Sequence, residues 1–256
     1  MKKNNFIRSI STFMQLSFYC VASLCAMSAA ASIVVVTPAS TNWGTTDANS
    51  AITSSEARSG NGSLELHGDR TRFFGLGNPF DASSNIGMLS NLSDFSFEWM
   101  ISSSSINPYH ADYTPALRLH IFDSGVRSEL IWEGAYNGVY GNIAKDNWYQ
   151  SQFDDYFYKW TAGVGVTEIY NRTITNWQSE YSQSAYISAV SIGVGSGASA
   201  NYLAYADNLT LEFGNERAVT FNFETASQVS APGSAGLAAL ALLLLGVSVR
   251  RSARRG

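Results

Sequence analysis

The stretch "DFSFEWMIS" (residues 94–102) alternates apolar side chains with other residues at a period of two. Its apolar members are Phe95, Phe97, Trp99 and Ile101. Because successive side chains of a β-strand point to opposite faces, this pattern predicts a strand with one face buried against a core.

The same alternation recurs along the chain, and it defines the expected fold class. It is found in "GSLELHG" (62–68), "ALRLHIFD" (116–123) and "AVTFNFE" (218–224), with Gly, Ser, Asn and Asp between the runs. No persuasive helical period precedes the C-terminal segment. We therefore predict an all-β domain over residues 32–228, built as an antiparallel β-sandwich (jelly roll) of two packed sheets.

The N-terminus has the pattern of a secretory signal peptide. Three basic residues in "MKKNNFIRSI" precede an apolar stretch (13–27), which ends in the small residues "SAAAS". This layout predicts a signal peptide over residues 1–31 that is removed near Ala31. We expect the mature protein to be exported.

Both cysteines of the chain, Cys20 and Cys25, lie inside this removable segment. The mature protein should then contain no disulfide, and burial must stabilise it. A lipoprotein is the alternative, but a lipid-modified cysteine needs a small residue directly before it. Here Tyr19 precedes Cys20 and Leu24 precedes Cys25.

The body of the chain (32–228) is strongly acidic. It holds nine basic residues against 20 acidic ones, a net charge of −11. Such a surface repels nucleic acid and anionic lipid, so we expect no nucleic-acid partner.

The C-terminus, "APGSAGLAALALLLLGVSVRRSARRG" (231–256), holds a short apolar run followed by arginines. As a helix, residues 235–249 would span about 22 Å, against about 30 Å for a bilayer core. We expect a C-terminal transmembrane helix in the segment 229–256, with everything before it on the outer side of that membrane. The predicted cytoplasmic stop comprises Arg250, Arg251, Arg254 and Arg255.

A short helix behind a Pro/Gly break, with a basic end, resembles the PEP-CTERM sorting segment of Gram-negative bacterial proteins. The stretch "FSFEWMISSSSINPYHADYTPALRLHIFD" (95–123) also looks like central strands of PEP-CTERM proteins. The resemblance implies an exosortase-like processing enzyme, an inner-membrane anchored precursor, and later display at the cell surface or in the extracellular matrix. Here Ala231, Pro232 and Gly233 replace the Pro-Glu-Pro of that family, so the identity of the enzyme stays open. A simple single-span anchor and a buried core helix are the alternatives.

Two stretches near the ends of the body, "EARSGNGSLELHG" (56–68) and "YADNLTLEFG" (205–214), resemble the extracellular carbohydrate-binding and concanavalin-like β-sandwich modules. In several of these modules the corresponding residues hold a structural calcium. The resemblance implies that Asp207 is a ligand, with backbone carbonyls near Ser59 or Gly60 and with Glu56. The alternative is that Asp207 caps a turn through its own side chain.

Aromatic residues are concentrated in "DNWYQSQFDDYFYKW" (146–160), among acids and amides. Flat rings stack on sugars while carboxylates and amides bond their hydroxyl groups, so this mixture predicts a glycan platform. The alternative is that these rings fill the core. The candidates for glycan stacking are Trp43, Trp132, Trp148, Tyr156 and Trp160.

An enzyme is the rival hypothesis, because a glycosidase needs two carboxylates about 5 to 9 Å apart. Glu129 and Glu133 share a strand face but lie four residues apart, which is about 13 Å along a strand. Glu98 and Glu133 could converge only if their strands are neighbours. We expect His67 and His120 to be surface residues, and no catalytic metal.

These observations favour an exported, non-catalytic protein of the cell surface or matrix that binds an extracellular polysaccharide. A secreted glycosidase or lyase of sandwich fold is the alternative. A purely structural or adhesive module is the third hypothesis, favoured if exposed aromatic rings are few and scattered.

Overall fold

The computed structural model describes residues 31–46, 48–168 and 171–226. The predicted signal peptide, apart from Ala31, and the predicted C-terminal helix lie outside these residues. In the described part of the chain, no helix has the length and hydrophobicity needed to span a bilayer. The sorting tripeptide and the cytoplasmic stop also lie outside the described residues: Ala231, Pro232, Gly233, Arg250, Arg251, Arg254 and Arg255.

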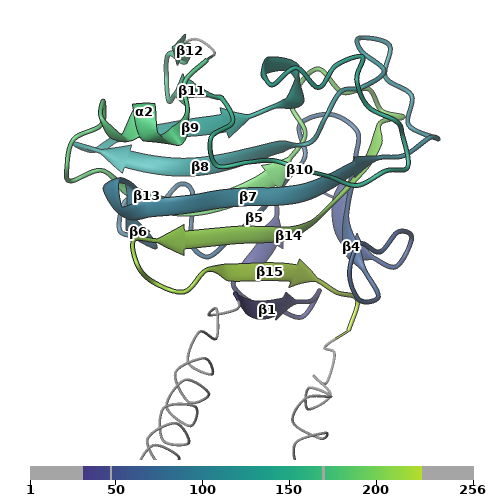
Figure 1. Ribbon diagram of the computed structural model, residues 1–256, viewed down its shortest axis with the longest axis horizontal. Coiled ribbons are helices and arrows are strands. Elements are labelled where there is room, and N and C mark those ends of the chain that lie inside the picture. The colour runs from purple at the N-terminus through teal and green to yellow at the C-terminus, as the bar shows by residue number, and fades with distance from the viewer. Residues whose placement is uncertain (1–30, 47, 169–170, 227–256) are drawn as a thin grey trace, which may run out of the picture.

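Two curled sheets make up the domain, and they pack as a β-sandwich (Figure 1). The first sheet contains β1 (Ser32–Val36), β3 (Ser50–Thr53), β4 (Ser63–His67), β7 (Leu92–Ile101), β10 (Tyr149–Gln150), β14 (Leu203–Phe213) and β15 (Val219–Phe223). The second contains β2 (Trp43–Thr45), β5 (Arg72–Gly75), β6 (Gly87–Met88), β8 (Ala116–Asp123), β9 (Val126–Trp132), β11 (Phe157–Thr161), β12 (Gly165–Glu168) and β13 (Tyr186–Gly193).

The predicted all-β fold is therefore confirmed, with one departure in strand direction. Among the described residues, the strand pairs are antiparallel except β1 and β15, which run parallel and place Ser32 beside Val219. Short helical elements occur in the connections. They are the 3₁₀ turns η1 (Leu89–Asn91) and η2 (Gly134–Tyr136) and the helix α2 (Ile174–Gln178).

Strand β14 organises the first sheet. β7 pairs along one of its edges, whereas β4 and β15 share the other edge, β4 at residues 203–206 and β15 at residues 209–211. Figure 1 shows β7, β14, β15 and β1 side by side. The pairing with β7 shifts register after Asp207, and Asn208 adopts a positive φ of 48°. This irregularity lies between the part of β14 that pairs with β4 and the part that pairs with β15.

The second sheet is built around the β8–β9 hairpin. Its two turn residues, Ser124 and Gly125, have φ values of 50° and 80°, as a type I′ turn requires. On one side β9 pairs with β11, and on the other β8 pairs with β13, which leads to β5 and β2. The hairpin therefore places β5, β8, β9, β11 and β13 in one continuous surface.

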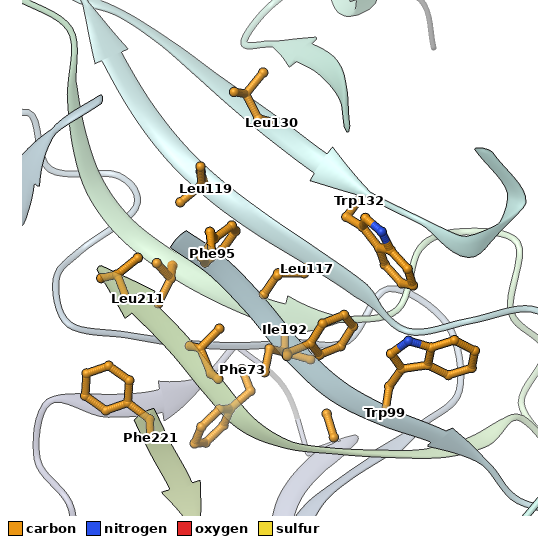
Figure 2. Packing of buried hydrophobic residues seen from close by; sticks show 14 of the residues in the cluster. Phe73, Phe95, Trp99, Leu117, Leu119, Leu130, Trp132, Ile192, Leu211 and Phe221 are labelled. Carbon is orange, nitrogen blue, oxygen red and sulfur yellow. The ribbon is translucent and has the colours of Figure 1, made fainter. Parts of the chain in front are cut away.

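The core lies between the sheets and contains the alternating residues that the sequence predicts. From β7 come Phe95, Phe97, Trp99 and Ile101, all at most 1% exposed. Figure 2 shows Trp99 and Trp132 turned toward each other across the sandwich, and their ring centroids lie 5.9 Å apart. Burying aromatic side chains of this size is the main stabilising contribution in a domain without disulfides. From β8, Leu117, Leu119 and Ile121 complete the opposite layer.

Candidate functional site

An open cleft of about 520 Å³ lies on the outer face of the second sheet. Alternation along the strands explains which side chains reach it. Leu117 and Leu119 of β8 point into the core, so Arg118 between them points outward. By the same rule Leu130 of β9 is a core residue and Glu129 faces the cleft.

Glu129 is the centre of the cleft, although it is only 2% exposed. The Arg127 Nη1–H group donates to Glu129 Oε1 over 2.7 Å, and both terminal nitrogens of Arg72 donate to its two oxygens over 3.3 Å. The Nε atom of Arg118 lies 3.9 Å from Oε2. Three guanidinium groups therefore surround one carboxylate.

This arrangement keeps Glu129 ionised. Burial works to raise the pKa of its carboxyl group, but His120 and the guanidinium groups of Arg72 and Arg118 outweigh burial and hold the pKa well below its ordinary value. For Arg72, burial and the charge of Arg118 lower the pKa, which shows how closely like charges are packed.

His120 lies directly beneath this cluster and is fully buried, so the prediction that it is a surface residue is wrong. It lies in β8, between the neighbouring strands β9 and β13, and its Nε2 atom is 2.8 Å from Ser191 Oγ. Its Nδ1 atom lies 3.5 Å from Glu129 Oε1. Burial lowers its pKa, so the ring is neutral near pH 7. His67, in contrast, is exposed as predicted and contacts Glu65.

Two aromatic rings, Trp160 and Phe80, border the cleft. The guanidinium carbon of Arg127 lies 5.0 Å from the Trp160 ring centroid and 5.2 Å from that of Phe80. Such cation–π contacts hold the arginine side chain in place. Trp160 is opposite Glu129 in the β9–β11 pairing, so this predicted stacking residue does face the cleft.

Two other stacking candidates, Trp43 and Trp132, are core residues, and the expectation for them is corrected. Trp43 is 9% exposed and stacks on Phe73 at 5.6 Å, while Gly75 lies against its indole ring. Trp132 is 1% exposed, and its Nε1–H group donates to Asp155 Oδ2. Neither ring has a face that a sugar could reach.

The aromatic stretch 146–160 does not form one platform. Phe157 is buried in the core, and Tyr149 stacks on Trp99 at 5.0 Å. Trp148 is half-buried in the loop before β10, and Tyr156 is 40% exposed just before β11. Neither of these two lines the cleft, which leaves Trp160 as the member of the stretch that does.

The predicted calcium ligand Asp207 lies in the irregular part of β14 and is fully buried. Backbone N–H groups of Asn208 and Phe223 donate to its Oδ1 atom, at 2.8 and 2.9 Å, and Ser59 donates to Oδ2. Burial, together with the charge of Glu224, raises the pKa of Asp207 to about 7. The predicted proximity of Asp207 to the Ser59–Gly60 turn is thus present.

The second carboxylate beside this turn is Glu224, whereas Glu56 is exposed. Glu224 accepts a hydrogen bond from the Asn61 N–H group, but its buried Oε1 atom has no partner. Gly60 has a φ of 81°, and a Cβ atom there would lie 1.7 Å from Oε1. Buried carboxylate oxygens of this kind suit a hard cation, which Asp207, Glu224 and carbonyls of the turn would hold.

Among the described residues, no three acidic, histidine or cysteine side chains cluster closely enough to hold a metal ion. A calcium at Asp207 would therefore need backbone or water oxygens in addition to the two carboxylates. The cation site stays a prediction.

The acidic residues considered for a glycosidase do not form a close pair of carboxylates in the structure. Glu98 lies on β7 in the first sheet and pairs with Arg58, whereas Glu133 follows β9 in the second sheet, so they are not on neighbouring strands. Glu133 accepts a hydrogen bond from the Tyr158 hydroxyl, and burial raises its pKa. Glu129 lies within β9, whereas Glu133 follows the last residue of that strand and is not among the described residues that line the cleft.

Comparison of the chain with known protein families, with curated proteins and with solved structures finds no significant match. The function is therefore argued from the site itself.

Arg72, Arg118 and Arg127 were not among the site residues predicted from the sequence. A signal was present for Arg118, which stands at an outward position of β8 between the inward residues Leu117 and Leu119. A charged side chain at such a position in the middle of a wide sheet needs a partner on the same face. What the sequence could not show is that the three strands lie together.

Proposed function

We propose that this protein is an exported, non-catalytic component of the cell surface or matrix, and that it binds an extracellular polysaccharide in the cleft of the second sheet. The observation that carries the proposal is the cleft itself, in which polar side chains fixed on strands lie beside the rings of Trp160 and Phe80. Open sites that combine aromatic walls with a few fixed polar groups suit sugar rings.

The proposal includes processing at the C-terminus. An exosortase-like enzyme would act near residues 231–233, while the apolar segment holds the precursor in the inner membrane. This part rests on the sequence pattern. The first strand begins at Ser32, directly after the expected cleavage site, which agrees with a signal peptide that ends at Ala31.

Binding without catalysis is favoured by the state of the acidic residues. Glu129 is bound by arginines on both oxygens, so it is a poor proton donor. Glu129 is also the one carboxylate among the described lining residues of the cleft, whereas glycosidases use a pair. A glycosidase or lyase therefore remains the less supported alternative.

The test uses the full chain in neutral detergent, retained on immobilised cellulose, xylan, alginate and polygalacturonate. We expect retention on at least one of these, and loss of it in Trp160→Ala. Trp148→Ala is the matched control, because its ring lies outside the cleft, and it should be retained like the parent protein. Equal retention of a folded Trp160→Ala variant, or no retention of the parent on any column, would contradict the proposal.

A further inference from the structure

Positive charge is concentrated in the cleft, although the body of the chain carries a net charge of −11. Four of the nine basic residues of the body line it, whereas Glu129 is the one acidic residue among its described lining residues. The cleft therefore has an excess of positive charge on a domain that repels anions elsewhere. These four residues are Arg70, Arg72, Arg118 and Arg127.

Arg118 lacks a partner for part of its guanidinium group. The residue is 4% exposed, and its buried Nη1 atom has no hydrogen-bond acceptor. Glu129 does not supply one, because its oxygens already accept from Arg72 and Arg127, and its Oε2 atom lies 3.9 Å from Arg118 Nε, beyond hydrogen-bond distance. A buried, charged donor without an acceptor is unfavourable, so the site is short of one anionic group.

We infer that the cleft binds an acidic polysaccharide, one whose sugars carry a carboxylate or a sulfate ester. This inference rests on the proposed function and names its substrate class. The guanidinium group presents a planar fork of donors that fits the oxygens of either anion, and the Nη1 atom of Arg118 has no acceptor within the protein.

Glu129 acts as a positioning residue for this site. By holding both terminal nitrogens of Arg72 and one of Arg127, it fixes their orientation before the ligand arrives. A binding group that is already ordered loses less conformational entropy when the ligand binds. Phe80 and Trp160 border the same cleft, where the apolar face of a sugar ring can pack.

The experiment compares ligands with one backbone and different charges. The full chain in neutral detergent is titrated calorimetrically with dextran, carboxymethyl-dextran and dextran sulfate at 150 mM NaCl, and with polygalacturonate. We expect binding to polygalacturonate and to at least one charged dextran, and at least about tenfold weaker binding to neutral dextran. The two charged dextrans distinguish a carboxylate from a sulfate ligand.

The variants locate the binding. Arg118→Met and Arg127→Gln should each weaken binding of the charged ligand about 10- to 100-fold, as expected when a hydrogen bond to a charged group is lost. Arg127→Gln is included because Arg118 is buried and its replacement could prevent folding. Arg217→Gln removes an exposed arginine elsewhere and should bind like the parent protein.

The outcomes separate this inference from the proposed function. Retention on a neutral column that depends on Trp160, with no binding of any charged ligand, would overturn the inference and leave the function standing. Equal loss of affinity in Arg217→Gln and Arg127→Gln would also overturn it, because attraction would then be diffuse. If no polysaccharide binds, neutral or acidic, the proposed function fails as well.

Discussion

Replacing Glu129 with glutamine tests the arrangement of the cleft directly. Glutamine keeps the length of the side chain but removes the charge that Arg72, Arg118 and Arg127 share. Because the side chains of Arg118 and Arg127 are only 5% and 16% exposed, water would screen their charges little. Removing one member of a buried ion pair costs about 3–5 kcal/mol, and we expect a loss of this size in the free energy of unfolding.

The loss is measured by thermal unfolding of the full chain in neutral detergent, followed by tryptophan fluorescence. At about 2–4 °C per kcal/mol for a domain of this size, Tm should fall by roughly 6–20 °C. Glu180→Gln is the control, because Glu180 pairs with Arg172 at a more exposed position, where an ion pair contributes about 1 kcal/mol or less.

Sulfate provides a second measurement on the same variant. If uncompensated arginines cause the loss, 20 mM sodium sulfate should raise the Tm of Glu129→Gln more than that of the parent, compared with NaCl at equal ionic strength. A loss below about 1 kcal/mol in Glu129→Gln, or equal stabilisation of both proteins by sulfate, would refute this reasoning.

Three further predictions concern other parts of the molecule. Burial lowers the pKa of His120, so the unfolded chain binds the proton more readily and the fold loses stability as pH falls below about 6.5. Denaturant titrations from pH 8 to 5 should show a smaller loss of stability in His120→Gln than in the parent protein. If calcium binds at Asp207 and Glu224, EDTA should lower the Tm of the parent protein by several degrees and leave the Tm of Asp207→Asn unchanged. An identical Tm of the parent protein with and without EDTA would contradict the calcium site. Mass spectrometry of the protein recovered outside the cell should find a product that lacks both residues 1–31 and the C-terminal segment; a membrane-bound form that keeps residues 231–256 would indicate an ordinary anchor.

The sequence predicts the core of this fold better than its outer faces. Alternation in β7 and β8 identifies the inward residues correctly, because a period of two leaves one choice of buried face. The same rule implies that His120 faces outward, which is true, but not that it is buried. Burial on the outer face depends on the neighbouring strands and on the arginine side chains above it, which come from distant parts of the chain.

Aromatic side chains show the same limit at the candidate site. Trp43 lies in a polar stretch of sequence, yet it is packed among Phe73, Phe221 and Phe223. Trp160 lies in a dense aromatic stretch, yet it faces the cleft. Which aromatic residue is exposed is set by strand register and by long-range pairing, neither of which local composition determines. The Asp207 site was partly predictable, but Glu224 becomes its neighbour only through the pairing of β14 with β15.

The most direct test of the central claim is to locate the bound polysaccharide on the surface of the protein. Hydrogen exchange of the full chain in neutral detergent, with and without polygalacturonate, measures protection along each strand. We predict that added protection is found in β5, β8, β9 and β11 and in the segments around Phe80 and Ser196, which together line the cleft. Protection confined to the 146–156 loop or to the first sheet, with these four strands unchanged, would contradict a polysaccharide site in the cleft.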